Sequence, residues 1–313
     1  MSGREGTSDE ATMWGLLLHL GYNMWSDREA SGSAEHITAR PYLRCDRGLW
    51  EDLTERAVGA GINTLVIDLG EGVRYDSHPE LAVEGSWSAD ELRAELSRLR
   101  GMGLEPIPKL NFSATHDIWL GAYSRAVSTP RYYEVCRDLI REVIDLFDEP
   151  RLFHLGMDEE TWQHQRNYAY VVVRQHELWW HDLEYLVGLV EEKGAQAWIW
   201  SDYAWNHDDY YERMPRSVLQ SNWYYGTAFD SPCNEVATYQ RLAEAGYDQV
   251  PTGSNWSTTE NMRLTVAHAR EHLPVEKLQG FLMTPWKPTL PSERPRHEQA
   301  IALMAQAKTL WES

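Results

Sequence analysis

The chain has 313 residues and a formal net charge of −19 at pH 7. This acidity argues against nucleic acid and anionic membranes as partners, because both attract basic patches. Hydrophobic residues make up 42% of the sequence, as in a typical globular protein, and the three cysteines show neither metal-binding spacing nor a disulfide framework.

The N-terminal residues carry acidic groups where a secretory signal peptide would carry basic ones. The apolar run that follows, residues 15–20, is too short to span a membrane. The cysteine pattern suits a reducing compartment. Together these features predict a cytoplasmic protein without a membrane partner, and we expect residues 1–11 to be disordered.

Eight segments are predicted to be β-strands, because each is short, apolar and bounded by turn residues or helical patterns. The fourth of them ends in a run of carboxylates and is considered separately below. The predicted strands are residues 13–22, 62–69, 104–110, 151–158, 195–201, 217–222, 248–253 and 280–284.

Between the strands, apolar residues recur at helical spacing. Asp46 is a predicted N-cap, and Ser88 with Glu91 forms a capping-box pattern. Gly61 is predicted to end the first helix, and Pro232 to occupy the first position of the sixth. With their capping residues, the predicted helices are residues 46–61, 88–103, 130–147, 174–193, 208–214, 231–246, 258–271 and 296–311.

Strands and helices therefore alternate eight times without a linker or a low-complexity segment. Strict alternation predicts a parallel sheet, and eight units of this size are what a (β/α)₈ barrel requires. We predict an α/β fold, a single-domain (β/α)₈ TIM barrel over residues 12–313.

Residues 151–162, RLFHLGMDEETW, pass from an apolar run into the carboxylates of Asp158, Glu159 and Glu160. Strand side chains alternate, so His154 and Asp158 should point to one side, which places Asp158 at the mouth of a barrel. Glu159 follows as the strand finishes and can turn over the same opening. Two adjacent carboxylates in different environments can divide into an acid and a base. The alternative is a helix start capped by Asp158.

Aromatic residues gather after the predicted strands. The chain has 15 Trp and 16 Tyr but only 5 Phe, and Trp and Tyr offer a flat face with a polar group. Seven of the eight predicted strands are closely followed by Trp. Active sites of such barrels lie at the carboxyl ends of the strands, so an aromatic cup with a few carboxylates predicts a carbohydrate site. These tryptophans are Trp25, Trp119, Trp162, Trp200 with Trp205, Trp223, Trp256 and Trp286.

Residues 154–159, HLGMDE, resemble the His-x-Gly-Gly-Asp-Glu motif of glycoside hydrolase family 20, the β-N-acetylhexosaminidases. Residues 107–116, from Ile-Pro-Lys-Leu-Asn to His, are similar to that family's Ile-Pro-Glu-Ile-Asp…Gly-His segment, and residues 200–202 to its Trp-Asp-Glu/Asp stretch. Trp223 and Trp286 fall where the family has pocket tryptophans. The resemblance covers about residues 12–311.

The chain departs from the family pattern at four places. Met157 replaces the second Gly of the motif, and residues 22–25 lack the Arg that grips sugar hydroxyls. Residues 254–256 replace a Tyr-x-Asp segment, and Pro288 stands where the family has an acid. The reaction centre thus resembles the family's, whereas recognition of the outer hydroxyls differs.

The resemblance implies removal of a terminal β-linked N-acetylhexosamine with retention of configuration and without a cofactor or metal. Glu159 would be the general acid and then the base, and Asp158 would hold the 2-acetamido group that attacks the anomeric carbon. Trp200, Trp223 and Trp286 would wall the acetamido pocket, and Tyr225 or Tyr224 would orient its oxygen. The predicted substrate-binding residues are Asp68, Asn111, His116, Trp200, Asp202, Trp223, Tyr225, Trp256 and Trp286.

The expected partner is a carbohydrate substrate, and a homodimer is possible. Three alternative functions remain open at this point. A retaining glycosidase for sugars without an acetamido group would use Asp202 or Asp68 as a nucleophile facing Glu159. A non-catalytic barrel would bind carbohydrate without turnover. A metal-dependent enzyme would use His19, Asp68, His154 and Asp158.

Overall fold

The computed structural model describes residues 12–313, so the expected disorder of residues 1–11 lies outside the described residues. Each predicted segment coincides with a strand that is shorter than predicted in every case but the last, and the seventh strand ends one residue beyond its predicted range. The strands are β1 (Met13–His19), β2 (Thr64–Asp68), β3 (Glu105–Lys109), β4 (Leu152–Gly156), β5 (Gln196–Trp200), β6 (Leu219–Ser221), β7 (Thr252–Ser254) and β8 (Gly280–Thr284).

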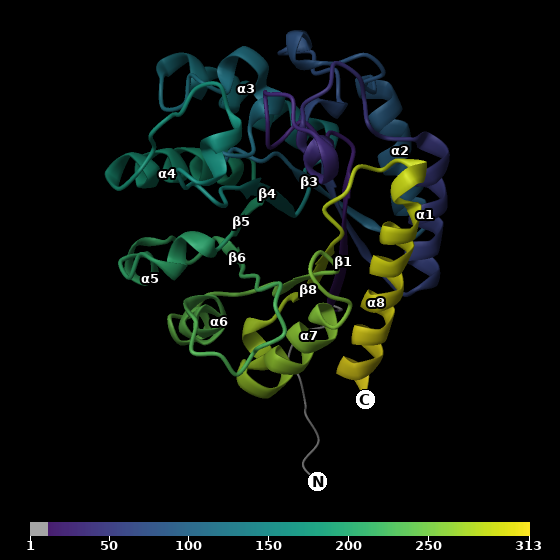
Figure 1. The fold of residues 1–313 in the computed structure, drawn as a ribbon, viewed down its shortest axis with the longest axis vertical. Coiled ribbons are helices and arrows are strands. Elements are labelled where there is room, and N and C mark those ends of the chain that lie inside the picture. The colour runs from purple at the N-terminus through teal and green to yellow at the C-terminus, as the bar shows by residue number, and fades with distance from the viewer. Residues whose placement is uncertain (1–11) are drawn as a thin grey trace.

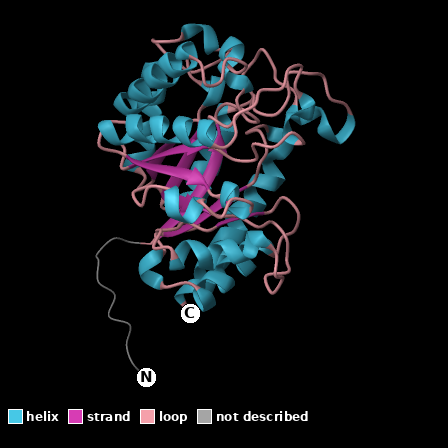
Figure 2. Ribbon diagram, turned by 90° about the vertical axis from the view of Figure 1, so that its left-hand side faces the viewer, coloured by secondary structure: helices cyan, strands magenta, loops and turns pink. Residues whose placement is uncertain are grey.

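All neighbouring strands are parallel, and their order around the sheet is β6-β5-β4-β3-β2-β1-β8-β7. Parallel bridges between Gln220 and Gln249 and between Trp223 and Thr252 join the two outer strands and close the ring. The strands lie in the middle of the molecule and the helices surround them (Figures 1 and 2). The predicted single-domain (β/α)₈ barrel is confirmed.

Helices connect the strands on the outside, and α8 lies beside α1 so that the first and last helices complete the outer layer (Figure 1). The Asp46 side chain caps α1, both halves of the Ser88–Glu91 capping box are present, and Gly61 has φ +76° after α1. The helices are α1 (Arg47–Gly59), α2 (Ala89–Gly101), α3 (Pro130–Leu146), α4 (Glu177–Glu192), α5 (Tyr210–Arg213), α6 (Asn234–Glu244), α7 (Asn261–His272) and α8 (Arg294–Glu312).

The starts of α4 to α8 differ from the prediction by two or three residues, and two of these differences have a clear local cause. Pro232 lies outside α6, because Cys233 keeps an extended backbone (φ −72°, ψ 152°) and serves as the N-cap. Helix α4 begins at Glu177, three residues after the predicted Arg174. The Arg174 side chain is buried between Glu160 and Asp182, and these ion pairs hold the segment before α4 in a non-helical conformation.

The strands separate two apolar layers. Leu17, Val66, Trp198 and Trp200 belong to a cluster inside the barrel. The larger cluster lies between the strands and the helices and includes Phe153, Leu155 and Met157. The predicted alternation of β4 is therefore observed, because its odd-numbered residues pack outward against the helices.

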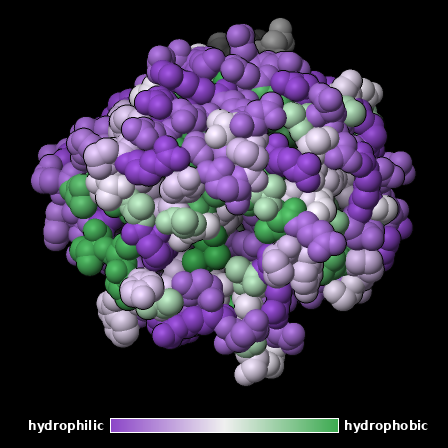
Figure 3. All heavy atoms as spheres, turned by 90° about the horizontal axis from the view of Figure 1, so that it is seen from above, coloured by the Kyte–Doolittle hydropathy of each residue, from purple (hydrophilic) through white to green (hydrophobic). Residues whose placement is uncertain are grey.

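No helix among residues 12–313 is long and apolar enough to cross a membrane. The face seen from above is mainly hydrophilic, with apolar residues in separate patches (Figure 3). Several exposed apolar side chains come from the connection between β4 and α4, namely Trp162, Tyr170, Val171 and Val173.

Candidate active site

The chain leaves β4 through an unusual backbone. Gly156, Met157 and Glu159 all have positive φ, at +74°, +72° and +55°. Positive φ is uncommon for residues other than glycine and is often found at functional sites. No helix begins at Asp158, so the N-cap alternative for this stretch is wrong. The Glu159 amide instead donates a hydrogen bond of 2.8 Å to the carboxylate of Asp202, which follows β5.

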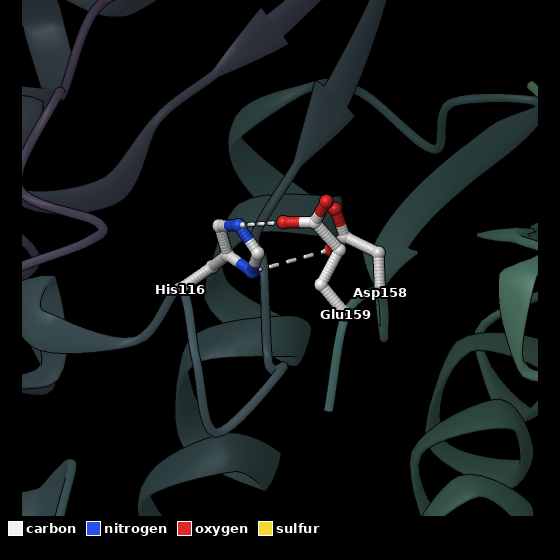
Figure 4. A group of neighbouring side chains, drawn as sticks. All are labelled: His116, Asp158 and Glu159. Atoms are coloured by element: carbon white, nitrogen blue, oxygen red, sulfur yellow. Dashed lines mark ion pairs between the residues drawn. The ribbon is translucent and has the colours of Figure 1, made fainter. Parts of the chain in front are cut away.

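This turn brings both predicted catalytic carboxylates against one imidazole (Figure 4). His116 Nδ1 lies 3.6 Å from Asp158 Oδ1, and His116 Nε2 lies 3.3 Å from Glu159 Oε2. The third carboxylate of the run turns away, because Glu160 pairs with buried Arg174. The end of β4 and the loop after β3 thus form one cluster of Asp158, Glu159 and His116.

The titratable groups in and around this cluster have shifted pKa values. Burial alone would lower the pKa of His116, but Asp158 and Glu159 outweigh it and raise that pKa to about 9. Burial alone would raise the pKa of Glu159, but the hydrogen bond and charge of His116 and the charge of His164 lower it. Burial and then the charge of Asp158 raise the pKa of Asp202 well above its usual value. The carboxyl groups of Glu159 and Asp202 therefore have pKa values shifted in opposite directions.

Hydrogen bonds from the loop after β3 fix the position of Asp158. Asn111 Nδ2 donates to Asp158 Oδ1 at 2.9 Å, and the Thr115 hydroxyl lies 2.9 Å from His116 Nδ1 and 3.2 Å from the Asp158 carbonyl oxygen. A Cβ on Gly156 would lie 2.0 Å from Asn111 Oδ1, so only glycine leaves room for this asparagine. The glycine of the HLGMDE motif is thereby tied to the position of the carboxylate.

A pocket of about 640 Å³ opens over the cluster. Trp223 and Tyr225 stack with ring centroids 4.8 Å apart, and Trp286 Nε1 donates to the Tyr225 hydroxyl at 3.0 Å. Tyr224 turns away and packs against Phe229. Of the predicted residues, His116, Asp158, Glu159, Trp223, Tyr225, Trp256 and Trp286 line the pocket.

Four predicted substrate-binding residues lie behind the pocket wall. Asn111 and Asp202 contact the two carboxylate residues from behind, as described above. Trp200 belongs to the cluster inside the barrel and is 1% exposed. Asp68 is buried and pairs with Lys109, and His19 Nδ1 lies 3.4 Å from the same oxygen. In this geometry these four support the pocket, and the substrate contacts predicted for them remain predictions.

Other lining residues come from loops that carry no pattern in the sequence. His164 Nε2 lies 3.4 Å from Glu159 Oε2, and its closeness to Glu159 in the chain is the one signal that could have found it. Loop residues far from any strand end, such as His36, offer no periodicity to read. The lining residues that the sequence did not predict include His36, Ile37, Gln163, His164, Arg166 and Asn167.

The connection from β4 to α4 is anchored across the pocket mouth to the loop after β1. The Tyr168 hydroxyl donates to the Met24 carbonyl at 2.7 Å, and Ser26 Oγ donates to the Asn167 carbonyl at 2.9 Å. The Ala169 amide donates to Asp27 Oδ1 at 2.8 Å. These bonds fix the segment that carries His164 and Arg166 above the carboxylates.

The cluster could also be a metal-binding site, because His116, Asp158 and Glu159 offer ligand atoms within 4.8 Å of one another. The raised pKa of His116 favours an imidazolium between two carboxylates, and an imidazolium cannot ligate a metal. The four residues of the metal alternative do not form such a group within residues 12–313, because Asp68 is occupied by Lys109.

No protein-family model matches the chain, and no curated protein matches it. Solved structures do. A catalytic module described as GH20 in the pneumococcal exo-β-D-N-acetylglucosaminidase has 15% sequence identity and a TM-score of 0.65, over 96% of this chain and 85% of that one. The Streptomyces plicatus N-acetyl-β-hexosaminidase has 14% identity and a TM-score of 0.62, over 94% of this chain.

A β-N-acetylhexosaminidase from Bacteroides fragilis is similar to the same degree, with 12% identity and a TM-score of 0.63 over 93% of this chain. The chain spans 64% of the Streptomyces plicatus protein and 65% of the Bacteroides fragilis protein. At these identities the similarity establishes a shared barrel fold.

Proposed function

We propose that the chain is a β-N-acetylhexosaminidase of the family 20 type, which removes a terminal β-linked N-acetylhexosamine by a retaining, substrate-assisted mechanism. The observation that carries this proposal is the pair Asp158 and Glu159 at the end of β4, bridged by His116 at the base of an aromatic pocket. The proposal is supported by the solved structures of this fold that are described as β-N-acetylhexosaminidases or as an exo-β-D-N-acetylglucosaminidase.

Glu159 acts as the proton donor. Its carboxyl gives a proton to the glycosidic oxygen while the substrate's acetamido oxygen attacks the anomeric carbon, and the leaving alcohol departs. The ionised Glu159 then takes a proton from water, whose oxygen attacks the anomeric carbon and reopens the oxazolinium ring. Two displacements at one carbon give net retention. His116 holds the Glu159 carboxylate between the two steps.

Asp158 and Tyr225 orient the acetamido group. Asp158 is fixed by Asn111 and accepts the acetamido N–H, which raises the nucleophilicity of the acetamido oxygen. Burial raises the pKa of Tyr225, so its hydroxyl keeps its proton and can donate to that oxygen. Trp223 and Trp286 provide the flat walls against which the acetamido methyl and the sugar ring pack.

A mechanism with an enzyme nucleophile would need a second free carboxylate facing Glu159. Asp202 accepts the hydrogen bond from the backbone of Glu159 itself, and its raised pKa disfavours the ionised form. Burial alone would raise the pKa of Asp68, but Lys109 and His19 lower it to about 2, and Lys109 occupies the carboxylate. The geometry therefore favours the substrate's own acetamido group as the nucleophile.

The test is a calorimetric titration with a thiazoline analogue of the oxazolinium intermediate. We expect tight binding to the wild type and weaker binding to Asp158→Asn, which loses the charge that the intermediate faces. Asp145→Asn, an exposed ion-pair residue outside the pocket, is the matched control and should bind like the wild type. Absence of binding to the wild type would overturn the proposal and favour a sugar without an acetamido group or a non-catalytic barrel.

A further inference from the structure

In the proposed reaction, the part of the pocket between Glu159 and the solvent faces the leaving group of the substrate. A general acid must touch the glycosidic oxygen, so the groups immediately outward of Glu159 lie next to the leaving group. His164 Nε2 lies 3.4 Å from Glu159 Oε2, and Arg166 follows it in the same short 3₁₀ turn. Both side chains line the pocket.

The outer half of the pocket, defined here by Trp25, His36, His164, Arg166 and Trp256, has a fixed positive charge on Arg166 in a strongly acidic chain. The sequence holds 48 Asp and Glu against 29 Lys and Arg. Within the described chain, however, Asp158 and Glu159 supply the only carboxylates of the pocket lining, while His36, His164 and Arg166 also line it. A guanidinium in a cleft attracts and orients an anionic ligand, and the imidazole N–H groups beside it can donate hydrogen bonds to the same ligand.

Arg166 is available for such a ligand. Its side chain is exposed, and no carboxylate of residues 12–313 lies within ion-pair distance of it. Other arginines near the same segment are occupied, as Arg174 is by Glu160 and Arg125 by Asp117. The backbone of the segment is held by the bonds of Asn167 and Tyr168 described above, so the guanidinium is presented from a fixed loop.

Aromatic rings complete the outer half. His36 lies between Trp25 and Trp256, with ring centroids 6.5 Å and 6.3 Å away. Trp25 in turn lies 6.0 Å from His116, so the aromatic wall runs continuously from the carboxylate cluster outward. A sugar ring can pack against this wall while an anionic substituent reaches Arg166.

We propose that the outer half of the pocket is a subsite for an acidic sugar as leaving group, with Arg166 binding its anion. The proposal rests on the proposed function, because it names the group that Glu159 protonates. The planar guanidinium matches a carboxylate with two parallel hydrogen bonds, and a sulfate ester offers the same acceptor chemistry. The substrate class is then a terminal β-N-acetylhexosamine linked to an anionic sugar.

The experiment compares three disaccharides that share one linkage: N-acetylglucosamine joined to glucose, to glucuronic acid and to glucose 6-sulfate. We expect the wild type to prefer the acidic disaccharides by about 5- to 10-fold in kcat/KM, as one hydrogen-bonded ion pair provides. Arg166→Gln should lose this preference, so that its kcat/KM values for the acidic and neutral disaccharides become equal, and Arg166→Lys should retain part of it. Arg74→Gln, an exposed arginine outside the pocket, should behave as the wild type.

The two acidic disaccharides show which anion the subsite binds. A higher kcat/KM for the glucuronic acid disaccharide indicates a uronic acid, and a higher kcat/KM for the glucose 6-sulfate disaccharide indicates a sulfated sugar. Equal kcat/KM for all three disaccharides would overturn the subsite, as would an equal loss for all three in Arg166→Gln. If none is cleaved, the proposed function fails. In that case the subsite is tested by measuring the affinities of the three intact disaccharides for the wild type by calorimetry. Equal affinities for the acidic and neutral disaccharides would overturn the subsite.

Discussion

Glu159 lies between two imidazoles, His116 at 3.3 Å and His164 at 3.4 Å. The first is buried and its pKa is raised to about 9, whereas the second is exposed on the loop at the pocket mouth. In the proposed mechanism, the proton that leaves with the glycosidic oxygen is shared between Glu159 and His116, because the two groups are in contact and their titrations are coupled.

Replacing the acid should separate proton donation from the rest of catalysis. We expect Glu159→Gln to lower kcat on a disaccharide by at least about 10²–10⁴-fold, the usual contribution of general acid–base catalysis. A 2,4-dinitrophenyl glycoside needs no proton to leave, so its first step should be far less affected. Steady-state and burst kinetics on both substrates measure this. Near-normal turnover of the disaccharide would contradict the assignment. Glu134→Gln is the control, because Glu134 is an exposed residue of α3 outside the pocket.

The imidazolium of His116 should make folding stability depend on pH. Its pKa is raised from 6.5 to about 9 by Asp158 and Glu159, so its contribution is fully present below about pH 6.5 and is lost as the pH rises through 9. We expect the free energy of unfolding of the wild type to fall by about 2–3 kcal/mol across this range. Urea denaturation at several pH values measures it. If His116→Gln showed the same decline, His116 would not be its source.

At the scale of secondary structure, the end of β4 is the element on which the site depends. Its last residue, Gly156, leaves space for Asn111, which in turn holds Asp158. Met157 keeps φ +72° although it replaces a glycine of the family motif. The turn therefore persists with a strained residue, because the hydrogen bonds around it fix its geometry.

Adding one methyl group at this turn should disable the site. Gly156→Ala places Cβ 2.0 Å from Asn111 Oδ1 at a positive φ, so we expect a loss of about 2–4 kcal/mol of stability and of most activity. Gly188→Ala is the control, because Gly188 is exposed inside α4 with open space around it. It should raise stability by about 0.5–1 kcal/mol. Thermal unfolding and kcat/KM distinguish the two, and equal effects would contradict the account.

The local sequence predicted the elements where a local cause determines them. The Asp46 cap, the Ser88–Glu91 box and Gly61 were predictable because their partners lie within a few residues. The start of α4 was not, because it depends on the pairing of Arg174 with Glu160. The same reason separates the candidate site into two parts: strand-end residues could be predicted from alternation, whereas the loop residues His164 and Arg166 depend on bonds to the loop after β1.

At the scale of the whole molecule, the net charge of −19 opposes the compact state. Many charged side chains form surface ion pairs, but such pairs contribute little individually. Raising the ionic strength from 0.01 to 0.15 M shortens the Debye length from about 30 Å to about 8 Å and screens the excess repulsion more than the close pairs.

Salt should therefore stabilise the protein. We expect the Tm to rise by about 2 °C between these ionic strengths at pH 7, which corresponds to roughly 1 kcal/mol. Differential scanning calorimetry in sodium chloride measures the shift. A Tm that falls on adding salt would mean that the surface ion pairs outweigh the net repulsion.

Four of the fifteen tryptophans, Trp25, Trp223, Trp256 and Trp286, face the same pocket. A ligand that enters displaces water from these indoles together, while the buried tryptophans of the core keep their surroundings. Their fluorescence should then move to shorter wavelength on binding, without a label or a coloured substrate. The intrinsic tryptophan fluorescence of the protein should therefore report ligand binding to the pocket. The affinities of neutral and acidic sugars can be ranked by the concentration at which the emission changes.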